Sequence, residues 1–406
     1  MPSTLPDGDP APASGELPES ALRGLGDRPF GFYVHVPFCV TRCGYCDFNT
    51  YTAAELGPGA SHHDYAETAI AEVRLARRVL GEAELPVRTV FFGGGTPTLL
   101  PARDLGRILA AIDAEFGLAA GAEVTTEANP ESVDPRSLED LRERGFTRIS
   151  FGMQSAREHV LRVLDRQHTP GRAGQAVLEA RKAGFAHVNL DLIYSTPGET
   201  DDDWRASLAA AIEAEPDHVS AYSLIVEKGT RLAARIRRGE LPMPDDDVAA
   251  DRYLIADEML GGAGYGWYEV SNWATTDAAR CRHNLLYWTG GDWWAVGPGA
   301  HSHVGGTRWW NVKHPAAYAQ RLAAGLSPAH AREELTADDR DTERLMLELR
   351  LDSGYPLAAV APRARPKVAA ALAGGLLEPE AFKTGRMVLT LRGRLLADAL
   401  VRDLLT

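Results

Sequence analysis

The chain has 406 residues, of which 45% are hydrophobic and 24% are charged, and this composition is typical of a folded globular protein. No apolar run approaches the roughly 20 residues that a membrane-spanning helix needs, which argues against an integral membrane protein. The net charge of −13 leaves little basic surface for a phosphate backbone, so we expect no nucleic-acid partner.

Residues 1–28 are rich in proline, glycine and acidic residues and hold few large apolar side chains. Such a segment cannot bury enough apolar surface to offset the entropy lost on ordering, so we expect a disordered tail. It also lacks the basic and apolar regions of a signal or transit peptide, and we therefore expect a cytoplasmic protein.

From residue 29 onward, short β-rich runs alternate with longer amphipathic stretches. The expected strands lie at 31–36, 87–92, 122–128, 148–154, 187–194 and 218–226. Strand–helix alternation predicts a parallel sheet with right-handed crossovers, hence an α/β fold. Six such units suit a partial barrel, (βα)6, better than a closed eightfold one. We place this barrel core at residues 29–230.

The pattern changes after residue 230. Residues 231–315 read as a charged insertion followed by a connecting segment rich in glycine and aromatic residues. Residues 316–406 read as helices and short strands, which predicts a small C-terminal accessory domain.

The most informative feature is a cluster of cysteines just after the first predicted strand. Three of the four cysteines of the chain, Cys39, Cys43 and Cys46, fall within eight residues, and the fourth is Cys281. Loops after the strands of a parallel barrel open onto its active-site face. Three thiolates there can hold three corners of a cubane iron–sulfur cluster. A structural zinc site, with Cys281 or a histidine as the fourth ligand, is the alternative that spacing alone leaves open.

The segment YVHVPFCVTRCGYCDFN resembles the cluster loop of the radical S-adenosylmethionine (SAM) superfamily, whose signature is Cx3CxxC. The segments FFGGGTPTLL, TTEANP, RISFGMQS and NLDLIYSTPGET follow the next four strands. In order and spacing they are similar to one branch of that superfamily, the oxygen-independent coproporphyrinogen III dehydrogenases (HemN) and the related haem chaperones (HemW). The similarity covers roughly residues 30–400, and it implies that residues 316–406 form a HemN-like accessory domain.

The resemblance implies a set of cofactor-binding residues. Cys39, Cys43 and Cys46 would ligate a [4Fe–4S] cluster whose fourth iron binds SAM, and an electron from a donor would cleave SAM to methionine and a 5′-deoxyadenosyl radical. The implied contacts to SAM or to the cluster environment are Tyr33, Tyr45, Gly94, Gly95, Thr96 and Glu127. Gln154, Arg166 and Asp191 match positions that line the barrel mouth around a second SAM in the dehydrogenases, and Ile225 matches a main-chain contact to adenine.

Some of these residues also have plainer interpretations. The glycine-rich run at 93–97 lacks the Lys-Ser/Thr of a phosphate loop and could be only a tight turn between strand and helix. Glu127 could be a solvated carboxylate at a strand end. Asp191 lies in a buried strand pattern, where a carboxylate is costly unless it is paired or bound to a ligand, and the alternative to ligand binding is an ion pair with Arg166.

Two departures favour the haem-chaperone branch. Phe48 stands where the dehydrogenases carry a further cysteine, and only the tail of 1–28 precedes the barrel, whereas the dehydrogenases carry a substantial N-terminal extension. Seven of the eight tryptophans lie between residues 267 and 310, either as a stacked core or as a surface for a flat ligand.

Within that window, HNLLYW resembles a motif of the haem chaperones associated with haem binding. Imidazole is the usual protein ligand of haem iron, so His283 is the predicted axial ligand. The other candidate ligands are His301, His303 and Cys281, and the nearest candidates to bind the haem propionates are Arg282 and Arg308.

The sequence therefore predicts a haem chaperone that carries a [4Fe–4S] cluster and SAM, binds haem and transfers it to an acceptor protein. The alternative is a coproporphyrinogen III dehydrogenase, and the acidic composition argues against a radical SAM enzyme acting on RNA. The expected partners are a haem acceptor, for which a transient membrane-associated protein is one expectation, and an electron donor.

Overall fold

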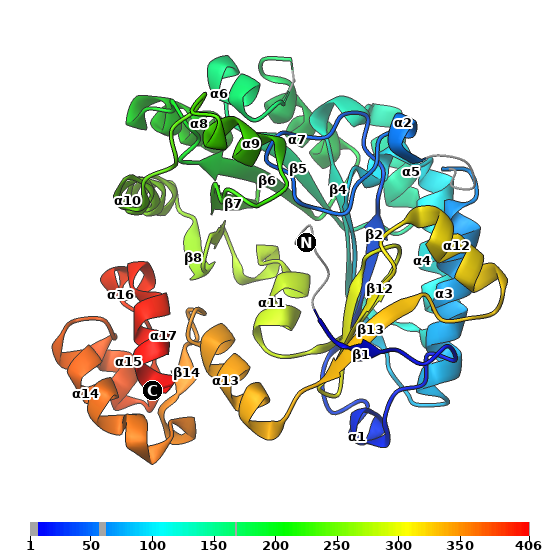
Figure 1. The fold of residues 1–406 in the computed structure, drawn as a ribbon. Coiled ribbons are helices and arrows are strands. Elements are labelled where there is room, and N and C mark those ends of the chain that lie inside the picture. Colours follow the sequence, from blue (N-terminus) through cyan, green and yellow to red (C-terminus); the bar gives the residue numbers. More distant parts are fainter. Residues whose placement is uncertain (1–6, 57–61, 167–168, 406) are drawn as a thin grey trace.

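The computed structural model describes residues 7–56, 62–166 and 169–405. Its centre is a curved layer of six parallel strands, each followed along the chain by helical structure (Figure 1). The parallel strands are β2 (Phe30–Val36), β3 (Val87–Gly94), β4 (Leu118–Ala128), β5 (Arg148–Gln154), β6 (His187–Tyr194) and β7 (His218–Ser223). Strands that follow one another in the chain are neighbours in the sheet. The predicted α/β fold with six barrel strands is confirmed.

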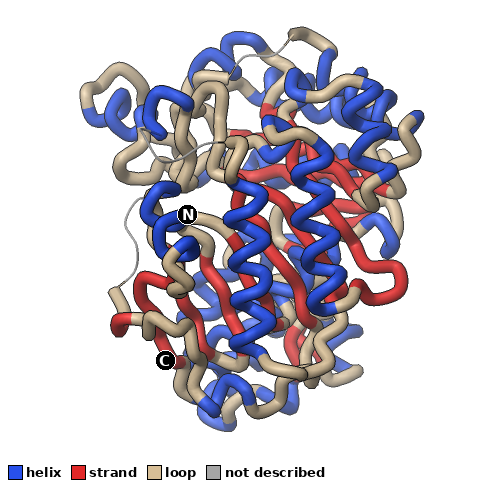
Figure 2. The backbone as a smooth tube through the Cα atoms, turned by 90° about the vertical axis from the view of Figure 1, so that its right-hand side faces the viewer, coloured by secondary structure: helices blue, strands red, loops and turns tan. Residues whose placement is uncertain are grey.

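Helices cover the outer side of this layer, as Figure 2 shows. They are α3 (Tyr65–Leu80), α4 (Ala102–Phe116), α5 (Pro135–Glu143), α6 (Glu158–Val163), α7 (Arg172–Lys182) and α8 (Asp201–Glu213), and the short α2 (Ala53–Leu56) precedes them. Local signals set their ends. Capping boxes start α5 at Asp134 and α8 at Thr200, and glycines at positive φ end α3 and α4.

Residues of the parallel strands alternate between two environments. In β5, Ile149 and Phe151 belong to the hydrophobic core under the helices, whereas Arg148 and Ser150 line a cavity inside the barrel. Successive side chains of a strand point to opposite faces, so each strand contributes apolar residues outward and polar residues inward. The inner face of the barrel is thus a polar surface for binding and chemistry.

The segment 231–315, predicted as a connection, instead extends the sheet at both edges. It begins with α9 (Arg231–Arg237) and α10 (Asp246–Gly262). On one edge, β9 (Asn272–Ala274) pairs with β7 and β8 (Gly266–Glu269) pairs with β9. On the other edge, β10 (Asp292–Val296) runs parallel to β2 and is followed in the sheet by β11 (His301–Val304) and β12 (Thr307–Asn311). A partial barrel has two open edges, and these strands satisfy the backbone groups there.

Between these two sets of strands, helix α11 (Arg282–Trp288) crosses the open side of the barrel and contacts β2 and β3 (Figure 1). Four of the seven clustered tryptophans are buried in this part of the molecule: Trp273, Trp294, Trp309 and Trp310. The aromatic segment is therefore largely a packed core.

The tail expected at residues 1–28 differs from the structure over residues 7–28. There, β1 (Asp9–Pro10) pairs with β13 (Ala329–Glu334), and α1 (Glu19–Leu22) lies against the main body, with Ala21 buried. Leu17, Leu22 and Leu25 pack on the main core. Composition alone cannot show this order, because the apolar surface that these leucines cover is supplied by residues far along the chain. Residues 1–6 lie outside the described residues.

The C-terminal unit also begins later than residue 316. Helix α12 (Pro315–Ala323) and β13 belong to the main body, where Tyr318 bonds to Glu72 of α3. A separate hydrophobic core, from Leu345 to Leu404, starts with α13 (Ala337–Glu348). It also contains β14 (Tyr355–Pro356), α14 (Arg365–Ala373), α15 (Pro379–Lys383), β15 (Arg386–Met387), α16 (Leu391–Leu395) and α17 (Ala397–Leu405). In the described part of the chain, no helix is long and apolar enough to cross a membrane.

Candidate functional site

The three clustered cysteines lie on the loop after β2, at the carboxyl end of the barrel strands. All three are free and half-buried. Backbone bonds pin the loop to other segments: Cys39 N donates to Tyr51 O at 3.0 Å, Gly44 N donates to Leu164 O at 3.0 Å, and Leu232 N donates to Gly44 O at 2.8 Å. The thiols are therefore presented by a loop whose path is set by the surrounding fold.

The chemistry of these thiols suits a metal cluster. Burial raises the pKa of Cys39 to about 11, with Cys46 and Cys43 acting in the same direction, and burial also raises the pKa of Cys46. Such thiols stay protonated at neutral pH until a metal displaces the proton. The donor set, three cysteine sulfurs on one loop, suits the [4Fe–4S] cluster that the cysteine spacing implies.

Cys281 lies at the other end of the barrel strands. Its Sγ is 3.8 Å from Oε1 of Glu123, which lies in the middle of β4, and the side chain is buried. Burial raises the pKa of this thiol to about 12. Cys281 therefore belongs to a different environment from the three clustered cysteines.

The glycine-rich turn after β3 packs directly on the cysteine loop. Gly95 N donates to Val36 O at 2.8 Å and Thr96 N donates to Phe38 O at 2.7 Å. A Cβ atom at Gly95 would lie 2.4 Å from the Phe38 carbonyl oxygen, and one at Gly94, whose φ is +106°, would lie 2.5 Å from the His35 ring. The packing of this turn on the cysteine loop therefore requires glycine at positions 94 and 95, in addition to the predicted approach of SAM.

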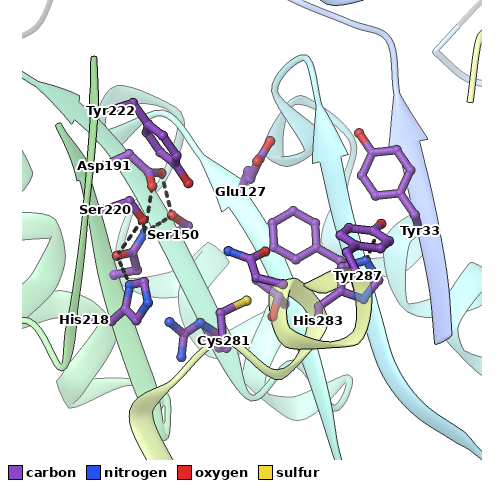
Figure 3. Close-up of a pocket in the computed structure, with 15 residues that line it drawn as sticks. Tyr33, Glu127, Ser150, Asp191, His218, Ser220, Tyr222, Cys281, His283 and Tyr287 are labelled. Atoms are coloured by element: carbon purple, nitrogen blue, oxygen red, sulfur yellow. Dashed lines mark hydrogen bonds between the residues drawn. The ribbon is translucent and has the colours of Figure 1, made fainter. Parts of the chain in front are cut away.

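Inside the barrel is a cavity of about 190 Å³ (Figure 3). Of the predicted site residues, Tyr33, Glu127, Asp191 and His283 line it. The other lining residues are Phe91, Thr125, Arg148, Ser150, Asn189, His218, Ser220, Tyr222, Cys281, Asn284 and Tyr287. The sequence analysis did not identify the strand residues in this second group. Their spacing could have identified them, because residues two apart in a strand share one face: Asn189 lies two residues before Asp191, and Ser220 lies two residues after His218.

Glu127 and Asp191 place two carboxyl groups in this cavity. Burial raises the pKa of Glu127 to about 8, with a contribution from Asp191, while the bond that Gly94 N donates to Glu127 Oε2 at 3.0 Å opposes the shift. Burial also raises the pKa of Asp191. Both side chains are only half-buried by surface area, because part of each faces the cavity. The pair can bind a cationic ligand, whose charge would favour loss of their protons.

Asp191 is held by neighbouring strands rather than by Arg166. Ser150 Oγ donates to Asp191 Oδ2 at 2.6 Å, and Asn189 Nδ2 donates to Asp191 Oδ1 at 2.8 Å. The ion pair between Asp191 and Arg166, the alternative raised by the sequence, is not formed among the described residues.

From Asp191 a hydrogen-bonded chain runs across the cavity wall to helix α11. Asn189 Oδ1 accepts from His218 Nδ1 at 2.6 Å, and Tyr268 OH lies 2.7 Å from His218 Nε2 and accepts from Cys281 N at 3.2 Å. Since the amide nitrogen of Asn189 donates to Asp191, its oxygen must accept, so His218 carries its proton on Nδ1. Burial lowers the pKa of His218 well below its usual range, which keeps the ring neutral.

The HNLLYW motif forms helix α11 and closes one side of this cavity. His283 Nδ1 lies 2.9 Å from Thr89 Oγ1 and its Nε2 lies 2.7 Å from Tyr287 OH. Asn284 and Trp288 lie near the buried carboxyl group of Glu269 and lower its pKa, against the larger effect of burial, which raises it. The two motif residues His283 and Tyr287 therefore bond to each other, and His283 also lies within hydrogen-bond distance of barrel strand β3 through Thr89.

This arrangement bears on the predicted haem ligand. His283 is 1% exposed, and both of its ring nitrogens are within hydrogen-bond distance of a partner, so it presents no free nitrogen to an iron atom. Its ring stacks on Phe91 with centroids 5.2 Å apart, and burial lowers its pKa to about 3. His283 is a core residue in this structure.

The other haem-binding candidates differ from one another. His303 is buried and its Nδ1 lies 3.3 Å from Gly291 O. His301 is half-buried and stacks on Trp310, and its Nε2 has no hydrogen-bond partner among the described residues. The two arginines expected to bind the haem propionates already have partners within the chain. Arg282 donates to Gly121 O at 2.8 Å, and Arg308 pairs with Glu333 and Glu343.

The remaining predicted residues gather near the cysteine loop. Gln154, at φ 64°, and Arg166 flank Gly152 at the carboxyl end of β5. Tyr45 packs against a small apolar cluster that includes Leu164 and Leu232. Two further residues that the sequence singled out, Phe48 and Ile225, are exposed.

Comparisons with known proteins agree with this geometry. The family description "Radical SAM superfamily" matches residues 33–211. "Heme chaperone HemW" of Mycobacterium tuberculosis (strain ATCC 25618 / H37Rv) is 54% identical over 390 residues, covering 96% of this chain and 98% of that protein. "Heme chaperone HemW" of Escherichia coli (strain K12) is 37% identical and covers 68% of this chain and 70% of that protein. The solved structure of coproporphyrinogen III oxidase (HemN) from Escherichia coli has a TM-score of 0.81, covers 97% of this chain and 94% of that chain, and is 23% identical, which supports a shared fold.

Proposed function

The chain belongs to the HemW family of haem chaperones in the radical SAM superfamily, and we propose that it binds haem and delivers it to an acceptor protein. The observation that carries the proposal is the 54% identity to HemW over 96% of the chain. The similarity to HemN is at 23% identity, and it adds no support for dehydrogenation of coproporphyrinogen III.

We propose that Cys39, Cys43 and Cys46 hold the [4Fe–4S] cluster of this family. The pinned loop and the three half-buried thiols support this assignment. When bound, the cluster supplies a one-electron centre with an iron position open to SAM. The chain's part is to fix the three sulfurs and to shield them from bulk water.

We propose that SAM binds from the cysteine loop into the barrel. Glu127 and Asp191, which face the cavity, would neutralise the cationic sulfonium and ammonium groups of SAM. Tyr33 borders the same cavity. The location of six further residues supports a role in SAM binding, because all of them lie on the cysteine loop or on segments packed near it. They are Tyr45, Gly94, Gly95, Thr96, Gln154 and Arg166.

We propose that haem binds outside the barrel interior. The cavity of about 190 Å³ is below the roughly 300–1,000 Å³ of pockets that enclose drug-sized ligands. Ligation by His283 would require α11 to leave the barrel and break the bonds to Thr89 and Tyr287. Of the candidate histidines, His301 has the nitrogen without a partner, and a buried polar atom without a partner is costly unless a ligand satisfies it. We therefore rank His301 above His283 as the axial ligand.

Two measurements test the proposed function. Titration of the reconstituted protein with haem should saturate near one haem per chain, and haem-loaded protein mixed with membranes from haem-depleted cells should lose its absorption band as a membrane haem protein gains one. In parallel, the protein is incubated anaerobically with coproporphyrinogen III and SAM. Formation of protoporphyrinogen IX, or the absence of saturable haem binding, would overturn the chaperone proposal.

A further inference from the structure

Arg166 is directed at a sulfur of the cysteine loop. Its Nη1 donates to Cys43 Sγ at 3.4 Å and its Nη2 donates to Gly152 O at 3.1 Å. Its main-chain nitrogen donates to Leu161 O at 2.9 Å, which ties the residue to the end of α6. The guanidinium thus bridges the carboxyl end of β5 and the cysteine loop.

The surrounding backbone is built for this approach. Gly44 N donates to Leu164 O, and a Cβ atom at Gly44 would lie 2.6 Å from Asp165 Oδ2. Asp165 adopts φ 52°, in the left-handed region that non-glycine residues seldom occupy. The absence of a side chain at Gly44 and the left-handed conformation of Asp165 together allow Arg166 to lie next to Cys43.

Within the described part of the chain, the charge of Arg166 has no carboxylate partner. It forms no ion pair with any acidic residue of 7–56, 62–166 or 169–405, although it is half-buried. By contrast, Arg162, one turn earlier, pairs with Glu158 at 2.6 Å, and Arg172 pairs with Glu179 at 2.8 Å. A poorly solvated cation needs hydrogen-bond acceptors, and among the described residues the acceptors that the Arg166 guanidinium reaches are Cys43 Sγ and Gly152 O.

We propose that Arg166 is a positioning residue that raises the reduction potential of the cluster by donating a charge-assisted hydrogen bond to the Cys43 thiolate. The inference rests on the proposed role of Cys43 as a cluster ligand. Reduction adds one electron to the cluster and makes it more negative. A cationic donor at a ligand sulfur stabilises that reduced state, and hydrogen bonds to the sulfurs are one of the factors that set cluster potentials. A one-electron donor of higher potential can then reduce the cluster.

The test is a redox titration followed by EPR without SAM, with dithionite as the reductant, on protein whose iron and sulfide content has been measured. We expect Arg166→Gln to reduce the equilibrium constant for reduction about tenfold, which corresponds to a midpoint about 59 mV more negative for a one-electron couple. Arg166→Lys, which keeps the charge but not the two-pronged geometry, should lie between this variant and the wild type. The matched control is Arg162→Gln, which removes an equal charge one turn away and should leave the potential unchanged.

The outcomes separate this inference from the proposed function. If the wild type takes up no cluster, the assignment of the cysteines fails. If Arg166→Gln holds a full cluster at the wild-type potential, the role of Arg166 fails while the assignment stands. Where the glutamine variant does not retain the cluster, the lysine variant decides: a wild-type potential in it contradicts the proposal, and a lower one supports it.

Discussion

Glu123 Oε1 lies 3.0 Å from the main-chain nitrogen of His283. A carboxylate of barrel strand β4 thereby caps the N-terminus of the helix that closes the barrel. Glu123 Oε2 also accepts from Arg282 N at 3.2 Å, so both oxygens serve free N–H groups of α11. The placement of the HNLLYW motif depends on this contact.

Replacing the cap should loosen the helix. We expect Glu123→Ala to lower the free energy of unfolding by about 1–2 kcal/mol, the usual cost of losing an N-terminal cap, while Glu123→Gln should cost less because the amide oxygen still accepts. Thermal unfolding measures both. Glu139→Ala, at an exposed position of α5, is the control and should change the unfolding temperature little. Equal stability of Glu123→Ala and the wild type would contradict the capping role.

Serine at each clustered cysteine should abolish cluster binding. Anaerobically reconstituted wild type is expected to hold about four irons and four sulfides per chain. Cys39→Ser, Cys43→Ser and Cys46→Ser should lose them, whereas Cys281→Ser, at the opposite end of the barrel, should retain them. Chemical analysis of iron and sulfide measures this loss. Stoichiometric zinc with no cluster uptake would contradict the assignment of the three cysteines as cluster ligands.

SAM affinity should depend on pH through Glu127. Its pKa of about 8 in the folded chain lies above the ordinary value of 4.5, so the side chain is largely protonated at neutral pH. Cationic SAM binds the charged form better, so affinity should rise as pH increases from about 6.5 to 8.5. In Glu127→Gln, which cannot ionise, this rise should be much smaller. Calorimetric titration at several pH values checks it, and parallel profiles for the two proteins would rule Glu127 out.

Stability should fall as pH rises through neutrality, in part because of Glu72. This residue accepts from Gly297 N and from Asn311 Nδ2, each at 2.8 Å, and burial raises its pKa to about 7 from the ordinary 4.5. Between these values the folded-state Glu72 binds more protons than the unfolded-state one. The contribution of Glu72 to stability is therefore fully present below pH 4.5 and is lost as pH rises through 7. The contribution is on the order of 3 kcal/mol.

Urea unfolding between pH 5 and 8 measures this dependence. Glu72→Gln should reduce the slope of unfolding free energy against pH, whereas Glu67→Gln, on an exposed turn of the same helix, should not. Other buried acids, such as Glu269, whose pKa burial raises to about 8, leave part of the slope in place. An unchanged slope in Glu72→Gln would exclude its contribution.

The candidate haem ligands predict different phenotypes. His283→Ala should lower the unfolding temperature, because it opens a cavity and leaves Thr89 and Tyr287 without their partner, yet it should retain the haem absorption band. His301→Ala should shift or abolish that band with a smaller effect on stability. The opposite pattern would restore His283 as the ligand and imply that α11 moves when haem binds.

Elements with local signals could be predicted from the order of the amino acids. The six barrel strands could be predicted because hydrophobic runs and helical stretches alternate within short windows, and the cysteine loop because Cys39, Cys43 and Cys46 are close in the chain. The resemblance to the HemN and HemW branch implied that Glu127 and Asp191 contact SAM, and both side chains line one cavity, from β4 and β6.

The other features could not be predicted, because they depend on contacts between residues far apart in the sequence. Glu123 caps a helix 160 residues later, and Asn49 bonds through its side chain to Pro298 O, 249 residues away. His283 resembled a haem ligand by its motif, but its burial and its bond to Thr89, 194 residues earlier, come from the docking of α11. Whether a side chain faces a ligand or the core depends on what the rest of the fold packs against it, and local patterns carry no information on that.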